Sequence, residues 1–108
     1  MLFNYKDQVY ILHFEYDESP NGERVTTAKF FSYDRDTEEK ILIAKGFSYC
    51  QPQDQFVKKV GRRIAVERLI ENLDGYMYDG YYRKEARNFR TEFWNAYHMQ
   101  SPIRKIKD

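Results

Sequence analysis

The sequence predicts a single α+β domain over residues 1–108, in which a three-stranded antiparallel sheet is followed by two helices in the order β-β-β-α-α. Three observations favour this class. The first half has alternating apolar positions and many β-branched and aromatic residues, which is typical of strands. The second half has apolar residues at helical spacing. A chain of 108 residues with 18% aromatic residues has the size and composition of one globular domain.

The first strand is expected over residues 8–16. Its core-facing side would carry Tyr10, Leu12, Phe14 and Tyr16, because alternate residues of a strand share one face. Residues 2–5 either extend this strand or pack as an arm. Residues 17–23 include Ser19-Pro20-Asn21-Gly22, and these turn-forming residues predict a hairpin loop.

The second and third strands are predicted over residues 24–33 and 40–49, joined by a polar turn at residues 34–39. Short connections between consecutive strands favour an antiparallel meander. Gly46 interrupts the third strand and indicates either a bulge or a close approach of another backbone.

The first helix is predicted from about residue 55 to residue 73, after Pro52 and with Asp54 as its N-cap. In its first half, one side of the helix carries apolar residues and a glycine: Phe56, Val57, Val60, Gly61, Ile64 and Ala65. The opposite side carries the basic residues Lys58, Lys59, Arg62 and Arg63. Beyond Ala65 the basic sector becomes apolar. Either the helix kinks, or another element covers its second half, and the last helix is the candidate for that cover.

A Tyr-rich segment at residues 74–82, with two Asp-Gly pairs, is predicted to be a loop. The last helix is expected over about residues 82–99 and would end at Ser101-Pro102. Its apolar stripe consists of Tyr82, Ala86, Phe89, Phe93 and Tyr97. The basic residues near its start are Arg83, Lys84, Arg87 and Arg90.

Charge is unevenly distributed along the chain, although the formal net charge is only +1. Residues 1–50 hold 6 Lys/Arg and 9 Asp/Glu (net −3), and residues 51–108 hold 12 and 8 (net +4). The strand half is therefore acidic and the helical half basic, which makes the basic half the candidate for an anionic partner.

The basic residues of the first helix are the strongest functional signal. Lys58, Lys59, Arg62 and Arg63 lie in its first turns, where the helix dipole disfavours cations, and the pairs four residues apart repel each other. Nucleic-acid phosphates or an acidic protein surface would relieve this repulsion. The alternative interpretation is a solvated basic surface balanced by Glu67, Glu71 or the acidic strands.

The tyrosines of the predicted loop form a second candidate site, comprising Tyr76, Tyr78, Tyr81 and Tyr82. Tyrosine side chains can stack on bases or anchor a protein interface. The equally weighted alternative is that some of them cover the core.

Several individual residues are better explained by a structural role than by a catalytic or ligand-binding role. Gly61 indicates close packing of the first helix on the sheet, and Arg68 is expected to pair with a carboxylate such as Glu15. Cys50 is expected to be a buried thiol. With His13 and His98 it does not form a zinc-ligand spacing, and no nucleophile–base arrangement is recognisable, so we predict no metal, no cofactor and no enzymatic activity.

The central stretch resembles a motif of small proteins from phages and prophages, Cys-x-Pro-x-Asp-x-Phe-x4-Gly-Arg-x-Ile-Ala-x-x-Arg. The pattern is met by Cys50, Pro52, Asp54, Phe56, Gly61, Arg62, Ile64, Ala65 and Arg68. The resemblance implies a small α+β protein of phage or mobile-element origin. It implies no defined activity, but anti-defence proteins such as anti-CRISPR inhibitors share this genomic setting and size.

The leading functional hypothesis is a non-enzymatic, phage-type interaction protein of the host cytoplasm. Its partner would be nucleic acid or a host nucleoprotein defence complex, bound through the basic residues of both helices. One alternative is a protein–protein adaptor or homodimer that uses the tyrosines; another is that the acidic residues Asp34, Glu38 and Glu39 meet a basic partner. No membrane role is expected, because the chain lacks a long apolar run and its start does not resemble a signal peptide, and a single cysteine fits a reducing compartment.

Overall fold

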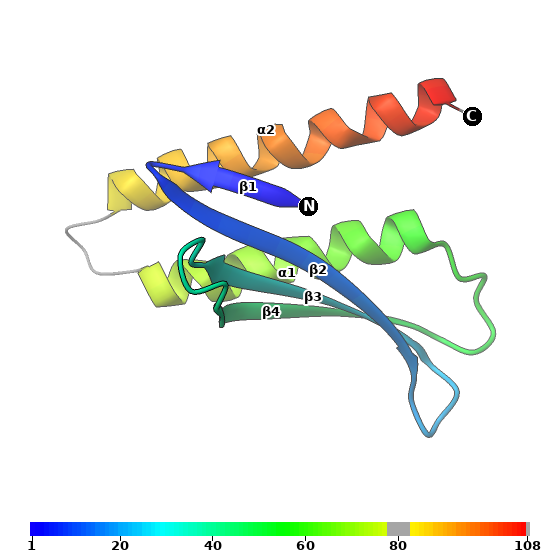
Figure 1. Cartoon of the computed structure of the whole chain (residues 1–108). Helices are drawn as coiled ribbons and strands as arrows, with labels where there is room; N and C mark the ends of the chain where they lie inside the picture. Colours follow the sequence, from blue (N-terminus) through cyan, green and yellow to red (C-terminus); the bar gives the residue numbers. More distant parts are fainter. Residues whose placement is uncertain (78–82, 108) are drawn as a thin grey trace.

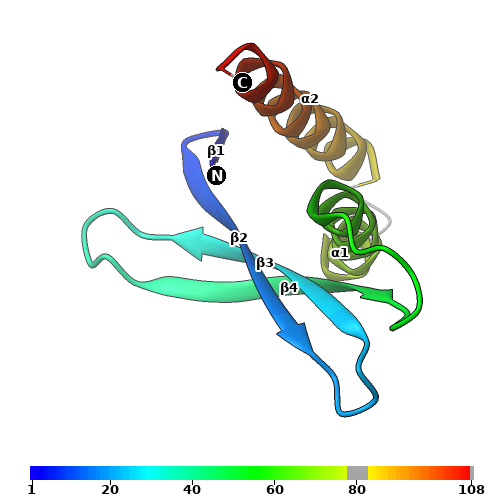
Figure 2. The ribbon, with the colours of Figure 1, turned by 90° about the vertical axis from the view of Figure 1, so that its right-hand side faces the viewer.

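A computed structural model of the chain shows a four-stranded antiparallel sheet followed by two helices (Figure 1). The structure describes the backbone of residues 1–77 and 83–107 and the side chains of residues 1–73 and 87–99. Its elements are β1 (Leu2–Tyr5), β2 (Gln8–Glu18), β3 (Arg24–Tyr33), β4 (Lys40–Cys50), α1 (Lys58–Met77) and α2 (Arg83–Lys107). Figure 2 shows both helices on one side of the sheet, and no other described helix or strand covers the opposite face, here called the open face. The α+β class is confirmed.

The predicted number of strands was wrong, because residues 2–5 form a strand of their own. β1 pairs antiparallel with β2, with Tyr5 opposite Gln8, so only Lys6 and Asp7 form the turn. Both turn residues have positive φ, 47° and 63°, as a two-residue hairpin turn with the right-handed twist of a sheet requires. Lys-Asp is not the usual Asn-Gly or Asp-Gly signal, which is why the sequence did not reveal this hairpin.

The remaining strands follow the predicted meander in the order β1-β2-β3-β4. The β2–β3 loop is closed by hydrogen bonds from Ser19 N to Glu23 O (2.8 Å) and from Gly22 N to Ser19 O (2.9 Å). A bulge is present in β4, but at Ile43 and not at Gly46, since the partner of β3 moves from Ala44 to Leu42 between successive residues.

The core lies between the helix-covered face of the sheet and the two helices. Phe89 and Phe93 of α2 are buried against Phe3 and Phe30, with ring centroids 5.4–5.9 Å apart in edge-to-face geometry. α1 contributes its own buried set, Ala65, Val66, Leu69, Ile70 and Leu73. The predicted core side of β2 is confirmed at Leu12, with Tyr10 and Phe14 packed on the core, but Tyr16 lies beyond it and is 39% exposed.

Two glycines allow α1 to lie close to the sheet. A Cβ at Gly46 would overlap the backbone of α1 at the Ala65 carbonyl and the Leu69 amide, so the predicted close backbone approach is confirmed. At Gly61 a Cβ would be 2.8 Å from Thr26 Oγ1, and the Gly61 carbonyl accepts a hydrogen bond from Ser48 Oγ at 2.9 Å. The expected close packing at Gly61 is therefore also confirmed.

Both ends of α1 differ from the prediction. Asp54 is not the N-cap, because residues 52–54 form a turn closed by Asp54 N and Gln51 O (3.0 Å). The helix begins at Lys58, with Gly61 N donating to Val57 O at 3.0 Å. At the other end α1 continues to Met77, so Tyr76 is helical and does not lie in a loop.

α2 also extends further than predicted. It runs from Arg83 to Lys107 and passes through Ser101-Pro102, the pair expected to end it. A proline removes one backbone donor and disfavours a helix interior, but it can be accommodated within a helix. The predicted apolar stripe is confirmed at Phe89 and Phe93, which are buried, and at Tyr97, which packs on the core.

Candidate functional site

Cationic and aromatic side chains from the start of α1, the end of β2 and the start of β3 meet in one group. We call this group the basic-aromatic cluster, and it consists of Tyr16, Arg24, Phe56, Lys58 and Arg62. Residues far apart in sequence supply it: Tyr16 is near the end of β2, Arg24 opens β3, and Phe56 lies just before α1. Its position is fixed by the packing of α1 on the sheet, which brings the first turns of the helix over Tyr16.

Tyr16 contacts two of the basic residues that were predicted to form a binding site. The Lys58 ammonium lies 4.9 Å from the centroid of the Tyr16 ring, and Arg62 Nη1 donates to the Tyr16 hydroxyl at 3.2 Å. Arg24 lies 5.7 Å from the ring centroid of Phe56, and the Tyr16 and Phe56 rings meet at 77°. Cation–π contacts of this kind restrain long side chains at about 0.5–1 kcal/mol each when exposed.

The acidic partners of these cations are few. Among the described residues, neither Lys58, Arg62 nor Arg24 forms an ion pair, whereas Arg63 Nε approaches Glu67 Oε1 at 3.9 Å. The expected balance by Glu67 thus applies to Arg63, and at that distance between exposed groups it is weak. Lys59 is exposed in the same turn.

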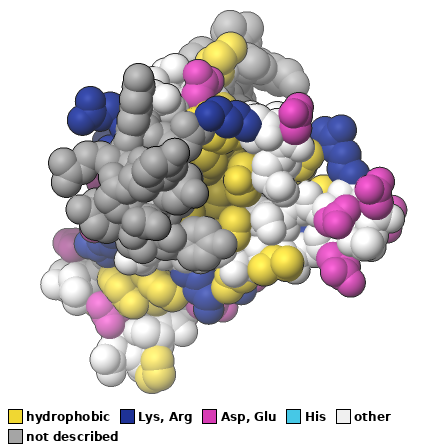
Figure 3. Space-filling model, turned by 90° about the vertical axis from the view of Figure 1, so that its left-hand side faces the viewer, with side chains coloured by type: hydrophobic (Ala, Val, Ile, Leu, Met, Phe, Trp, Pro, Cys, Tyr) yellow, Lys and Arg dark blue, Asp and Glu magenta, His cyan; other side chains and the backbone are white. Residues whose placement is uncertain are grey.

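Acidic side chains gather at the far end of the sheet. The β3–β4 turn carries Asp34, Asp36, Glu38 and Glu39, all exposed, and Figure 3 shows acidic side chains grouped at that side of the molecule. The β2–β3 loop brings Glu18 opposite Arg24 as well, so the cluster is flanked, but not neutralised, by carboxylates. Carboxylates therefore lie at both ends of the sheet.

The basic residues of α2 lie elsewhere. Figure 1 shows α2 starting beside the end of α1, so Arg87 (exposed) and Arg90 (partly buried) lie towards the opposite end of α1 from Lys58. The two basic segments therefore do not form one continuous site. Arg83, Lys84 and Tyr76 belong to helices whose side chains are not described at these positions, and Tyr78 and Tyr81 lie outside the described residues.

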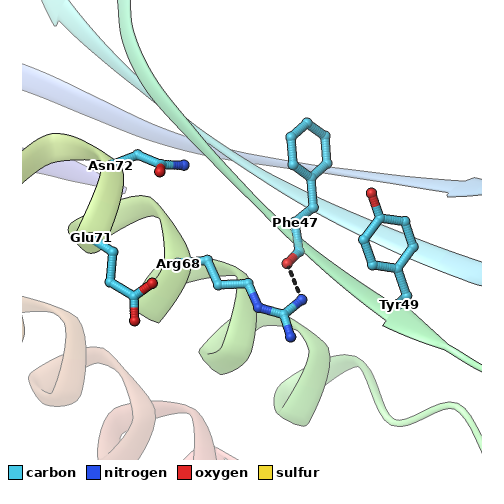
Figure 4. A pocket seen from close by; sticks show the side chains of 5 residues that line it. All are labelled: Phe47, Tyr49, Arg68, Glu71 and Asn72. Atoms are coloured by element: carbon cyan, nitrogen blue, oxygen red, sulfur yellow. Dashed lines mark hydrogen bonds between the residues drawn. The ribbon is translucent and has the colours of Figure 1, made fainter. Parts of the chain in front are cut away.

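A second surface feature lies along the outer edge of β4. We call it the β4 groove; it has a volume of about 350 Å³ and is lined by Phe47, Tyr49, Arg68, Glu71 and Asn72 (Figure 4). Arg68 Nη1 donates to Phe47 O at 2.6 Å, and Asn72 Nδ2 donates to Lys45 O at 2.7 Å. The sequence reasoning missed this site; the alternation of Lys45, Phe47 and Tyr49 on one side of a strand was the available signal.

The expected ion pair between Arg68 and Glu15 is wrong. Glu15 lies on the open face of β2, away from α1, where Lys29 Nζ donates to its Oε1 at 2.9 Å. Arg68 uses a backbone carbonyl in place of a carboxylate. Cys50, expected to be buried, is partly buried, and its Sγ lies 3.7 Å from the carbonyl oxygens of Gln51, Asp54 and Gln55.

Removal of the Glu15 charge should lower the stability of the fold at pH values above the range in which carboxyl groups titrate, and not at pH values below that range. The Lys29 hydrogen bond, opposed in part by desolvation, lowers the pKa of Glu15 below its ordinary value of 4.5. A depressed folded-state pKa stabilises the fold above the unfolded pKa, and this contribution is lost as pH falls through the folded pKa. We expect Glu15→Gln to lower the urea midpoint at about pH 7 and to have a smaller effect at about pH 3. Glu39→Gln in the exposed turn is the control, and an equal effect of Glu15→Gln at both pH values would contradict the assignment.

Within the described side chains, no three His, Cys, Asp or Glu residues come close enough to hold a metal ion. No helix in the described part of the chain is long and apolar enough to cross a membrane.

Comparison with protein-family models, with curated proteins and with solved structures finds no match to this chain. The fold and the site therefore define its class only as an α+β protein with an open sheet face and a basic-aromatic cluster. The resemblance to small phage proteins stays a prediction.

The residues that carry that resemblance have structural roles around α1. Gly61 and Ala65 contact the sheet, Arg68 binds a β4 carbonyl, and Cys50 faces the loop carbonyls before the helix. Arg62 and Phe56 are the residues of the motif that contact Tyr16 in the basic-aromatic cluster. The motif thus coincides with the segment that places α1 on β4.

Proposed function

We propose that this protein is a non-enzymatic binding protein that engages nucleic acid, free or within a nucleoprotein complex, through the basic-aromatic cluster. The observation that carries the proposal is the arrangement of Lys58 and Arg62, which are held on Tyr16 without an acidic partner among the described residues. Phosphate oxygens are the anions that such a set of Lys and Arg donors binds best.

Two physical arguments support this proposal. Side chains already restrained by an aromatic ring lose less conformational entropy when a ligand binds. In addition, Lys58 and Lys59 are the first two residues of α1, which has no acidic residue in its first turn. The dipole of the helix therefore adds positive potential at the same place, and an anion there relieves the repulsion between the cations.

The biological form of the proposal follows from the resemblance to small phage proteins. We propose an anti-defence protein of the anti-CRISPR kind, acting in the cytoplasm of the host. By binding phosphate backbone, or the nucleic-acid-binding surface of a defence complex through its own charge, it would prevent recognition of the invading nucleic acid. The acidic β3–β4 turn gives the molecule an anionic end for a basic surface of such a complex.

The test is a salt series of binding to labelled duplex and single-stranded oligonucleotides. Lys58→Gln/Arg62→Gln should weaken binding about tenfold or more and reduce the slope of log K against log salt by about 2, one unit for each lost phosphate contact. The matched control, Arg35→Gln/Lys40→Gln, removes the same charge at the other end of the sheet. We expect it to change binding little.

An equal loss with both double variants would mean that net charge, and not the cluster, drives binding. Absence of binding at low salt would reject the nucleic-acid proposal. The adaptor or homodimer hypothesis would then take its place, and exposed apolar side chains such as Leu2 (68%) and Ile41 (65%) would be the surfaces to examine.

A further inference from the structure

The open face of β4 carries a cation and two exposed aromatic rings in succession. Lys45, Phe47 and Tyr49 alternate with Ala44, Gly46 and Ser48, which are buried on the helix side. Phe47 is 37% exposed and Tyr49 is 56% exposed. Rings of this size are normally covered, so two neighbours that face solvent indicate a surface for a ligand.

The two rings stand nearly parallel. Their centroids are 6.5 Å apart and their planes differ by 23°. A planar base can stack against the exposed surface of either ring.

The β4 groove continues from these rings around the strand edge to α1 (Figure 4). Arg68 uses one of its five N–H donors in the hydrogen bond to Phe47 O. This bond fixes the guanidinium at the rim of the groove, and the other N–H donors can bind an anion. Asn72 donates to Lys45 O, and its amide oxygen remains an acceptor beside the carboxylate of Glu71. The groove thus offers a cation for a phosphate and acceptors for the N–H groups of a base.

The same hydrogen bonds argue against an added peptide strand as the occupant. A strand that paired with the edge of β4 would need the outward carbonyls of Lys45 and Phe47 as acceptors. Asn72 and Arg68 already occupy both carbonyls. Side chains that cover an edge in this way protect it from strand addition.

We propose that the β4 groove is a second binding site, which takes an unpaired base and its phosphate from single-stranded nucleic acid. Phe47 and Tyr49 stack on the base, and Arg68 binds the phosphate. The inference rests on the proposed function and adds to it a preference for single strands, because a base paired within a duplex cannot reach the rings.

The groove and the basic-aromatic cluster lie at the same end of the sheet. Tyr49 precedes Cys50, and the partner of Cys50 on the neighbouring strand is Arg24 of the cluster. Tyr16, which contacts Lys58 and Arg62, is paired with Thr26 of β3, and Thr26 is paired with Ser48, the residue before Tyr49. A strand of nucleic acid that reaches both sites therefore crosses β3 and passes around the edge of β4.

The experiment compares a fluorescently labelled oligo-dT with the same oligonucleotide annealed to oligo-dA, by anisotropy at fixed salt. Phe47→Leu/Tyr49→Leu removes both rings and keeps apolar side chains at exposed positions, so the fold is retained. We expect its affinity for the single strand to fall about tenfold, as the loss of one base–ring stack predicts, with duplex affinity unchanged. Tyr33→Leu, an aromatic on the same face at the far end of the sheet, is the matched control and should have no effect.

The outcomes separate this inference from the proposed function. If the wild type binds both forms and the double variant weakens neither, or weakens both equally, the β4 groove does not bind bases while the basic-aromatic cluster still binds phosphate. If the wild type binds no oligonucleotide, both proposals are rejected. Competition of oligo-dT binding by an extended peptide would likewise overturn the assignment of this groove to nucleic acid.

Discussion

Gly46→Ala should destabilise the protein by about 3 kcal/mol or more, which is a large part of the ordinary stability of a domain of this size. The added methyl group would overlap the Ala65 carbonyl and the Leu69 amide and would lie 2.8 Å from Leu69 Cα. All three are backbone atoms of α1, so no rotation of a side chain can relieve the overlap. The helix would have to move away from β4, and buried contacts of Ala65 and Leu69 would be lost with it. Chemical denaturation followed by circular dichroism measures the effect.

Gly61→Ala is the matched control for this substitution, because it adds the same methyl group to the same helix–sheet contact. Its Cβ would be 2.8 Å from Thr26 Oγ1 and 3.4 Å from Ser48 Oγ, so it meets side-chain atoms and not the backbone of a neighbouring element. Alanine also favours a helix interior over glycine by about 1 kcal/mol. We expect a net change within about 1 kcal/mol, and similar losses for the two variants would show that the α1–β4 contact is looser than the structure indicates.

Phe93→Ala should cost about 3–5 kcal/mol and loosen α2 from the sheet. The Phe93 ring is fully buried and meets the rings of Phe3 and Phe30 edge-to-face at 5.5 Å. Truncation would leave a cavity among aromatic neighbours that cannot collapse to fill it. α2 contacts β1, α1 and this core.

The single tryptophan allows the unfolding of α2 to be followed separately from that of the other elements. Trp94 lies beside Phe93 on α2, with ring centroids 6.0 Å apart, so its fluorescence reports on this helix. We expect the Trp94 transition of Phe93→Ala to occur at lower denaturant than the circular dichroism transition of the sheet and α1. Met99→Ala, a side chain 69% exposed on the same helix, should leave both transitions unchanged. Coincident transitions at the wild-type midpoint would contradict this account of α2.

These stability predictions bear on the proposed sites in different ways. The basic-aromatic cluster and the β4 groove both depend on the contact of α1 with the sheet, since α1 supplies Lys58 and Arg62 to one and Arg68 and Asn72 to the other. Loss of α2 alone would leave these contacts in place. We therefore expect Gly46→Ala to impair binding at both sites, and Phe93→Ala to impair it less at equal loss of stability.

The sequence alone determined the elements whose signals are local. Alternation and β-branched residues predicted β3 with its observed bounds, Arg24–Tyr33, and turn residues predicted the loops on either side of it. Helical spacing predicted two helices and the buried Phe89 and Phe93, and the low tolerance of helices for glycine predicted the close contact at Gly61. These features follow from backbone hydrogen bonding and side-chain periodicity within a few residues.

Only the tertiary structure decided which residues meet. The start of α1 was misplaced because Asp54 resembles an N-cap, while the packing of the chain delays the helix to Lys58. The packing of α1 on the sheet also explains why one side of the helix is basic in its first half and apolar in its second half. Val57 and Val60 stay exposed at the start of the helix, and Lys58 and Arg62 turn to Tyr16, which is more than 40 residues away in sequence. Strand register and helix docking are properties of the whole fold, so no local pattern could assign Tyr16 to the basic residues or Arg68 to the carbonyl of Phe47.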